Sequence, residues 1–268
     1  MNYRHAFHAG NFADVVKHLA LIEILLHLRK KDAGFAVVDT HAGRGVYDLA
    51  ADEAQRTKEA DEGVHRLRDL KAAGPTALSF YLDCTRGDLY PGSPLLAAKL
   101  LRSQDRLVAV EKQPEEAAVL AQVLRPFHRA RVERDDGYTR LAALLPPPER
   151  RGLVLIDPPY ESADEFSEAA RAFAGALRRF ANGIYLIWFP VKSPAQADGF
   201  CGEVLATGPA KVLRLDVSRR PGADERLSAA GLLIVNPPWR FAEEMRETLK
   251  PVLPLIGAEA QFTSLAGE

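Results

Sequence analysis

The sequence predicts an α/β fold built on a seven-stranded, mostly parallel sheet. Short apolar runs alternate with segments of helical periodicity along most of the 268 residues. Runs of this kind are typical of strands that helices cover on both faces, as in a doubly wound sheet. In addition, an acidic residue ends or closely follows several of the runs, at Asp39, Glu111, Asp136 and Asp157.

The apolar runs place the expected strands at 35–39, 106–111, 131–133, 152–157, 183–189, 211–217 and 231–236. Helical patterns cover 12–30, 94–104, 114–125, 163–180, 194–207 and 240–250. The last two expected strands are joined by a short loop between 217 and 231, which suggests that they form an antiparallel hairpin.

The first two strands are unusually far apart, with 72 residues between their ends at Asp39 and Glu111. A strand–helix–strand unit needs about 30 residues. We therefore predict a main domain of residues 1–49 and 91–268, with a helical insert subdomain at 50–90. This insert is polar, and Gly74-Pro75 breaks it in the middle. After it, Ser93 is expected to cap the next helix, with Pro94 as its first residue.

Composition is ordinary for a globular protein, with 47% hydrophobic residues, 26% charged residues and a net charge of −1. There is no apolar run of the roughly 18 residues that span a bilayer and no signal-peptide pattern, so we expect a cytoplasmic protein. Cys84 and Cys201 stand far apart, which argues against a disulfide framework or a structural zinc site. The histidines near the N-terminus lack the spacing of a third ligand, so we expect no metal.

The residues after the first three strands are suited to a nucleoside ligand. Gly43 and Gly45 let the backbone turn tightly, although the third glycine of a dinucleotide-binding fingerprint is missing. Glu111 can accept hydrogen bonds from two ribose hydroxyls. Asp136 can accept one from an adenine amino group, while Gly137 lets the ring lie close. Each of these features alone is equally compatible with an ordinary turn or a solvent-facing carboxylate.

The most specific segment is Asp157-Pro158-Pro159-Tyr160 after the fourth strand. An apolar strand that ends in this motif is typical of methyltransferases that act on amino groups of nucleobases. An exocyclic amine is a weak nucleophile because its lone pair is delocalised into the ring. A carboxylate and a prolyl carbonyl can accept its two N–H bonds and direct the lone pair at a sulfonium methyl group. The two prolines stiffen the loop, and Tyr160 offers a face on which a base can stack.

A second segment of the same form, Asn236-Pro237-Pro238-Trp239, follows the last strand. Asn-Pro-Pro also occurs in methyltransferases, so this loop is an alternative catalytic site. The order of the strands favours Asp157, because it follows the fourth strand behind the three other acidic turns. We assign Asn236 a structural or base-flanking role.

The N-terminal segment combines aromatic and basic residues in Tyr3-Arg4-His5 and leads into a helix that carries Lys17 and His18. Such a mixture suits stacking on bases and holding phosphates. Together with the motifs above, the segment resembles the RlmJ family of bacterial 23S ribosomal RNA adenine-N6 methyltransferases. Further matching stretches are Asp39-Thr-His41-Ala-Gly43, Tyr90-Pro-Gly-Ser93-Pro94 and Ile234-Val-Asn-Pro-Pro-Trp239, and the insert is the least similar part.

The resemblance implies a Rossmann-like class I methyltransferase that depends on S-adenosylmethionine and methylates the N6 of one adenosine in 23S ribosomal RNA. It implies Asp157 as the catalytic residue and a set of cofactor-binding residues, namely His18, His41, Ser93, Glu111, Asp136, Gly137 and Asp157. Tyr3 matches a position at the RNA substrate, and His5 and Lys17 are expected to assist it, with residues 1–18 acting as a lid. We expect a monomer. Methylation of guanine N2, and a non-catalytic RNA-binding or ribosome-assembly protein, remain alternatives.

Overall fold

The main sheet has eight strands, in the order β10-β8-β9-β7-β6-β1-β4-β5. The structure is a computed structural model, and it describes residues 4–73, 76–162, 164–219 and 227–267. The strands are β1 (Ala36–Asp39), β4 (Arg106–Val110), β5 (Ala130–Glu133), β6 (Gly152–Ile156), β7 (Ile184–Pro190), β8 (Val212–Arg219), β9 (Ala229–Val235) and β10 (Ala258–Ala266). All seven predicted strands are present.

The prediction of seven strands was wrong by one, because β10 adds to the far edge of the sheet. It pairs only with β8, in antiparallel orientation. An edge strand has a single neighbour and need not be apolar, and the sequence Ala-Glu-Ala-Gln-Phe-Thr-Ser gives little sign of it. The predicted hairpin of the last two expected strands is confirmed, since β8 and β9 pair antiparallel.

The direction of the strands decides which ends meet. Strands β7, β6, β1, β4 and β5 are mutually parallel, so their carboxyl ends share one edge of the sheet. Strand β9 runs antiparallel to β7 and ends at the opposite edge, with Val235 paired to Tyr185 near the start of β7. After β1 the chain adds β4 and β5 on one side of that strand, and then returns to add β6 and β7 on its other side. The crevice beside such a switch point is where ligands bind in open α/β sheets.

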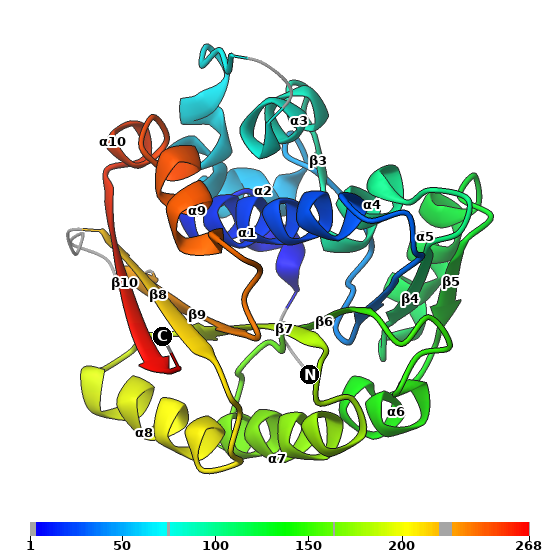
Figure 1. The fold of residues 1–268 in the computed structure, drawn as a ribbon. Coiled ribbons are helices and arrows are strands. Elements are labelled where there is room, and N and C mark those ends of the chain that lie inside the picture. The colour runs from blue at the N-terminus through cyan, green and yellow to red at the C-terminus, as the bar shows by residue number, and fades with distance from the viewer. Residues whose placement is uncertain (1–3, 74–75, 163, 220–226, 268) are drawn as a thin grey trace.

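Helices cover both faces of the sheet (Figure 1). One layer holds α1 (Phe12–Arg29), α4 (Ser93–Leu100), α5 (Pro114–Leu124) and α9 (Phe241–Leu249), and the other holds α6 (Gly137–Leu144), α7 (Asp164–Arg179) and α8 (Pro194–Leu205). A short α10 (Leu253–Ile256) leads into β10. Each layer packs on its own cluster of buried apolar side chains, so the sheet lies between two cores.

The helix starts follow the capping residues of the sequence. Asn11 caps α1 by accepting a hydrogen bond from the backbone N–H of Asp14 at 2.8 Å. Asp136 caps α6, a helix that the sequence analysis did not predict because it took this residue as part of a turn. Ser93 was wrongly expected as a cap: it is the first residue of α4, Gly92 precedes it, and its hydroxyl donates to Asp39 instead.

Between β1 and β4 the chain forms a small region of its own. Strands β2 (Val46–Asp48) and β3 (Leu89–Pro91) pair antiparallel and bring its two ends together. Between them lie α2 (Asp52–Thr57), α3 (Ala77–Cys84) and the short 3-10 helices η2 (Glu59–Glu62) and η3 (Val64–Leu67). Gly74-Pro75 lies outside the described residues. Helix α3 packs on α1. The division into a main domain and an insert at 50–90 stays a prediction.

The N-terminal segment is held against this region. It forms the 3-10 helix η1 (His5–Phe7) before α1. Glu59 receives hydrogen bonds from His8 and from the amide of Asn11, at 2.8 and 3.0 Å. Gly63 approaches the segment so closely that a Cβ atom there would lie 2.1 Å from the carbonyl oxygen of Gly10. The role of this segment as a lid stays a prediction.

Candidate active site

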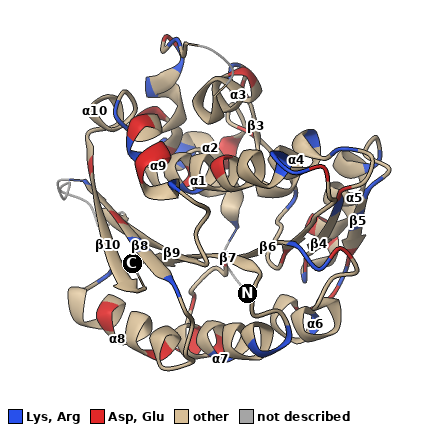
Figure 2. Cartoon of the chain, viewed as in Figure 1, with Lys and Arg blue, Asp and Glu red and all other residues tan. Residues whose placement is uncertain are grey.

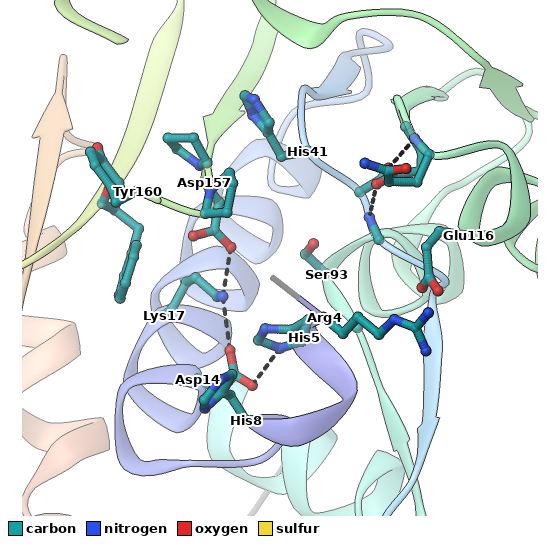
Figure 3. Close-up of a pocket in the computed structure, with 18 of the residues that line it drawn as sticks. Arg4, His5, His8, Asp14, Lys17, His41, Ser93, Glu116, Asp157 and Tyr160 are labelled. Atoms are coloured by element: carbon teal, nitrogen blue, oxygen red, sulfur yellow. Dashed lines mark hydrogen bonds and ion pairs between the residues drawn. The ribbon is translucent and has the colours of Figure 1, made fainter. Parts of the chain in front are cut away.

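A cavity of about 1040 Å³ opens at the carboxyl ends of the parallel strands, and nearly all the predicted site residues line it. They are His5, Lys17, His18, His41, Ser93, Glu111, Asp136, Gly137, Asp157 and Tyr160. Figure 3 shows side chains from α1 and from several strand ends converging on this space. Tyr3 lies outside the described residues. The volume is at the upper end for small-molecule pockets, which leaves room for more than one ligand group.

Glu111 follows β4 and is held by the backbone. Its Oε2 accepts a hydrogen bond from the N–H of Gly43 and its Oε1 accepts one from Gln113, at 2.8 and 2.7 Å. Burial raises the pKa of this carboxyl above its ordinary value. Each carboxylate oxygen has a second lone pair, so the group can still accept hydroxyl donors from a ligand.

Asp136 follows β5 and starts α6. Its Oδ1 accepts from the N–H groups of Tyr138 and Thr139, and its Oδ2 lies 3.0 Å from the ammonium of Lys112. Burial alone would raise its pKa, but Lys112 and the backbone N–H groups outweigh burial and lower it. Gly137 packs on β1, where a Cβ atom would lie 2.0 Å from the carbonyl oxygen of Thr40. Only glycine therefore lets the two strand ends approach this closely.

The end of β1 supplies a neutral histidine and a buried carboxyl group. His41 is paired with the Thr40 hydroxyl at 2.8 Å, and burial lowers its pKa to about 4. The Ser93 hydroxyl donates to Asp39 Oδ2 at 2.7 Å. Burial raises the pKa of Asp39 to about 7. From the sequence, Asp39 was identified as an acidic strand end and given no role in the site, and its buried position behind Ser93 explains its raised pKa.

Asp157 lies in a chain of polar side chains that crosses the cavity (Figure 3). Lys17 Nζ lies 2.6 Å from Asp157 Oδ2 and 2.8 Å from Asp14 Oδ1, and His5 Nε2 lies 2.9 Å from Asp14 Oδ2. Burial alone would lower the pKa of Lys17, but the two carboxylates outweigh burial and raise it. The ammonium therefore stays charged and fixes one oxygen of Asp157, which leaves Oδ1 for another donor.

Asp14 is a site residue that the sequence analysis did not assign. It is 2% exposed and also accepts a hydrogen bond from the N–H of Gly10 at 2.9 Å. The sequence places Asp14 on the same helical face as Lys17, but it does not indicate which part of the chain contacts that face. The nearby Trp188, at the end of β7, also lines the cavity, with the Lys17 ammonium 5.8 Å from its ring centre.

Tyr160 is less exposed than expected for a ring on which a base stacks. It is 4% exposed, its hydroxyl donates to the carbonyl of Trp188 at 2.8 Å, and its ring lies 4.5 Å from that of Phe166. The side chain thus anchors the Asp157 loop to β7 and to the core under α7. Stacking of a base on this ring stays a prediction.

The cavity wall contains two buried polar atoms without a hydrogen-bond partner among the described residues, Tyr138 Oη and Trp188 Nε1. Buried polar groups are nearly always paired, so such atoms indicate that a polar ligand completes the site. Together with Glu111, Asp136 and the capped start of α6, they fit a nucleoside cofactor with an amino-acid tail. Among the described residues there is no cluster of metal-binding side chains, nor any helix long and apolar enough to cross a membrane.

The second Pro-Pro loop is remote from this cavity. Asn236 follows β9 at the opposite edge of the sheet, and its side-chain amide donates to the carbonyl oxygens of Ala181 and Gly183 at 2.9 and 2.8 Å. Trp239 is 82% exposed. Asn236 therefore has the structural role that the sequence analysis gave as one of two options.

The family described as ribosomal RNA large subunit methyltransferase D, RlmJ, matches residues 32–262. This chain belongs to that family. Ribosomal RNA large subunit methyltransferase J from Escherichia coli is 40% identical over 93% of this chain and 91% of its own length. The protein of the same name from Haemophilus influenzae is also 40% identical, over 93% of this chain and 92% of its own.

Two solved structures are similar to this chain in fold. A protein from Legionella pneumophila superposes with a TM-score of 0.88 and 34% identity, over 96% of this chain and 98% of the other. A probable spermidine synthase from Corynebacterium glutamicum has a TM-score of 0.55 at 13% identity, over 97% of this chain and 77% of the other, which reflects the shared fold alone. The predicted Rossmann-like methyltransferase fold and the predicted family are both confirmed. The protein is thus a methyltransferase with S-adenosylmethionine as donor.

Proposed function

We propose that this RlmJ family member methylates the exocyclic N6 of one adenosine in 23S ribosomal RNA. The observation that carries the proposal is the position of Asp157. Its carboxylate lies at the end of β6 and faces the same cavity as Glu111 and Asp136, on the ligand edge of the sheet. The proteins that share 40% of its sequence are named ribosomal RNA large subunit methyltransferases. S-adenosylmethionine supplies an electrophilic methyl group on a sulfonium.

In the proposed reaction Asp157 binds the amino group of the target base. Lys17 holds Oδ2, so Oδ1 accepts one N–H bond of the amine, and the carbonyl of Pro158 accepts the other. Both acceptors lie on a loop that two prolines stiffen and that Tyr160 ties to β7. Accepting both N–H bonds localises the nitrogen lone pair, and fixed groups accomplish this without reorganisation during the reaction. With S-adenosylmethionine bound, the nitrogen would attack its methyl carbon as the carbon–sulfur bond breaks and S-adenosylhomocysteine leaves. The methylated nitrogen would then lose one proton, and no covalent enzyme intermediate is formed.

The cofactor is proposed to lie across the ends of β1, β4 and β5. Glu111 accepts its ribose hydroxyls and Asp136 its adenine amino group, while Gly137 gives the ring room. The remaining proposed contacts to the cofactor are His18, His41, Ser93 and Asp157. Helix α4 begins at Ser93, and its N-terminal end favours negative groups such as the cofactor carboxylate.

The RNA is proposed to enter from the side of the N-terminal segment, with Tyr3, His5, Lys17 and Tyr160 near the base. Neither face of the fold is uniformly basic in Figure 2, where Lys and Arg alternate with Asp and Glu over both helical layers. Recognition is therefore proposed to rely on the local shape of the RNA around the adenosine more than on a broad phosphate-binding surface. The protein is proposed to act as a cytoplasmic monomer.

Nucleoside analysis tests the proposal. The purified protein is incubated with labelled S-adenosylmethionine and 23S ribosomal RNA from cells that lack the modification, and the RNA is then digested. We expect label in N6-methyladenosine. Label in N2-methylguanosine would instead establish the guanine alternative. Absence of label, with retained RNA binding, would support the non-catalytic alternative.

A further inference from the structure

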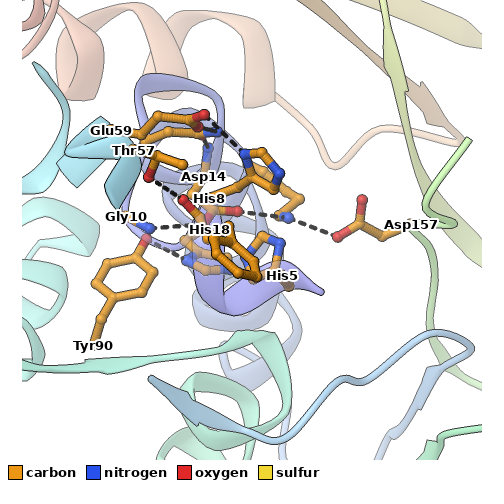
Figure 4. A network of polar contacts seen from close by, with 12 residues as sticks. His5, His8, Gly10, Asp14, His18, Thr57, Glu59, Tyr90 and Asp157 are labelled. Carbon is orange, nitrogen blue, oxygen red and sulfur yellow. Dashed lines mark hydrogen bonds and ion pairs between the residues drawn. The ribbon is translucent and has the colours of Figure 1, made fainter. Parts of the chain in front are cut away.

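Two buried tyrosines connect the region between β1 and β4 to His18, which lines the cavity. The Tyr90 hydroxyl of β3 lies 2.8 Å from His18 Nδ1 and 3.1 Å from the Tyr81 hydroxyl of α3. Their exposed fractions are 1% for Tyr90, 0% for Tyr81 and 2% for His18. Figure 4 shows the contact of Tyr90 with His18 beside the network of Asp14 and Asp157. The rings of His18 and Tyr90 also stack, with centroids 5.5 Å apart.

The hydrogens of these groups can be assigned by elimination. Burial lowers the pKa of His18 to about 3, so the ring is neutral and carries one proton. Among the described residues, the Tyr81 hydroxyl has no hydrogen-bond partner other than Tyr90. If Tyr90 donated to Tyr81, the hydrogen of Tyr81 would be buried without an acceptor. If His18 donated to Tyr90, the two hydroxyls could pair only with each other, and one of their two hydrogens would be buried without an acceptor. An unpaired buried donor costs about 1–3 kcal/mol.

One arrangement pairs both hydroxyl hydrogens: Tyr81 donates to Tyr90, and Tyr90 donates to His18 Nδ1, which leaves the ring proton on Nε2. The geometry points to Tyr90, supported by Tyr81, as a positioning residue that fixes the proton of His18 on Nε2 and so presents an N–H donor to the cofactor. The complementary ligand group is an acceptor, and the carboxylate of the amino-acid tail is the acceptor that S-adenosylmethionine offers. The region between β1 and β4 thereby contributes to the site through Tyr81, which does not line the cavity.

The contact with Tyr90 also prevents His18 from turning its other nitrogen into the cavity. A chain of two hydroxyls strengthens each hydrogen bond through mutual polarisation. Loss of the first donor, Tyr81, is therefore expected to weaken the hold on His18, whereas loss of Tyr90 removes it. The cofactor part of this inference rests on the proposed role of His18, but the state of the ring does not.

Nitrogen-15 NMR of the histidine rings tests the inference in the full chain without cofactor or RNA, with the His18 signals assigned from His18→Gln. We expect Nδ1 to be unprotonated and hydrogen-bonded and Nε2 to carry the proton. A proton on Nδ1 would overturn the inference, whether or not the protein methylates adenosine. This measurement on the native chain remains decisive if a variant fails to fold.

Binding of S-adenosylhomocysteine, measured by calorimetry, tests the consequence. We expect Tyr90→Phe to weaken binding about tenfold and Tyr81→Phe to weaken it about two- to threefold, since the loss of a single hydrogen bond has effects of this size. Both variants should also change the Nδ1 signal of His18. Tyr185→Phe is the matched control, because its hydroxyl also makes one buried hydrogen bond, to Phe180, in the other core. Unchanged His18 signals and unchanged affinity in Tyr90→Phe would contradict the inference.

Discussion

Two loops of nearly the same sequence end strands of the same sheet, yet their surroundings differ. Asp157-Pro-Pro-Tyr160 faces the cavity, where Lys17 holds its carboxylate and Tyr160 is buried against β7. Asn236-Pro-Pro-Trp239 lies at the opposite edge, where Asn236 binds two backbone carbonyls and Trp239 is exposed. Both loops bend through a left-handed residue, Tyr160 with φ of 50° and Asn236 with φ of 53°.

The direction of the preceding strand, and not the motif itself, decides which loop can take part in catalysis. Strand β6 runs parallel to β1 and delivers Asp157 to the edge where the other acidic strand ends meet. Strand β9 runs the other way and delivers Asn236 to the ends where β7 begins. The carboxylate of Asp157 therefore remains available to a ligand, whereas the side-chain amide of Asn236 is already hydrogen-bonded to the backbone carbonyls of Ala181 and Gly183.

The largest effect is expected from Asp157→Ala, which removes the acceptor of the target amine. We expect the rate of methyl transfer to fall by about 10²-fold or more, with the affinity for S-adenosylhomocysteine largely retained. Trp239→Ala, in the other loop, is the control and should leave transfer unchanged. Single-turnover assays with ribosomal RNA measure both. Full turnover by Asp157→Ala would remove the catalytic assignment.

A large loss of stability is expected from Lys17→Met, because it leaves the buried carboxylate of Asp14 and the partly buried carboxylate of Asp157 without their shared cation. We expect the free energy of unfolding to fall by about 3 kcal/mol. In the control, Lys112→Met, the lysine side chain is 67% exposed and its loss should cost less than about 1 kcal/mol. Denaturant titration at neutral pH compares the two, and equal losses would show that the network around Lys17 contributes no special stability.

Asn236→Ala should affect stability and spare chemistry, the reverse of Asp157→Ala. The substitution removes two hydrogen bonds to carbonyl oxygens and places alanine at a positive φ. We expect the free energy of unfolding to fall by about 2 kcal/mol, while the rate of transfer at a temperature where the variant is folded stays the same. A tenfold lower rate of methyl transfer by the folded variant would show that this loop takes part in catalysis.

The last expected effect is a pH dependence of stability that arises from Asp39, at the end of β1. The pKa of Asp39 is about 7 in the fold, above its ordinary 3.8, because the carboxyl is buried. Its contribution to stability is therefore complete below about pH 4 and is lost as the pH rises through 7. Asp39→Asn lacks this loss, so its free energy of unfolding relative to the native chain should rise by at most about 1.4 kcal/mol per pH unit between pH 4 and 7.

Denaturant titrations of both proteins across this range give the difference directly. The amide keeps an acceptor for the Ser93 hydroxyl, which limits other changes. Asn236→Ala serves as the control, since it removes no titrating group and should be displaced by a constant amount. A difference between Asp39→Asn and the native chain that does not vary with pH would show that Asp39 is ionised throughout.

Much of the fold was predictable because its signals are local. Apolar runs marked seven strands, and the short connection between the last two indicated their hairpin. Strand β10 and helix α6 were missed because an edge strand need not be apolar and because Asp136 was taken as a turn residue. The family followed from motifs spread along the chain, and the comparisons confirm it.

The site was predictable in its residues but not in its contacts. The order of the strands indicated that Glu111, Asp136 and Asp157 would converge, since the carboxyl ends of parallel strands share an edge. Nothing in the sequence indicated that Lys17 bridges Asp14 and Asp157. Lys17 and Asp157 are 140 residues apart in the chain. The base-stacking role expected of Tyr160 depended on exposure, and tertiary packing leaves that ring 4% exposed.

The sequence by itself determined the identity of the chemical groups, the alternation of strands and helices, and the family of the protein, because periodicity and motifs act over short stretches. Only the tertiary structure decided which of two similar loops meets the cavity, which oxygen of Asp157 remains available and which nitrogen of His18 bears the proton. These outcomes depend on the direction of neighbouring strands and on buried partners distant in the chain, and such partners are paired by packing.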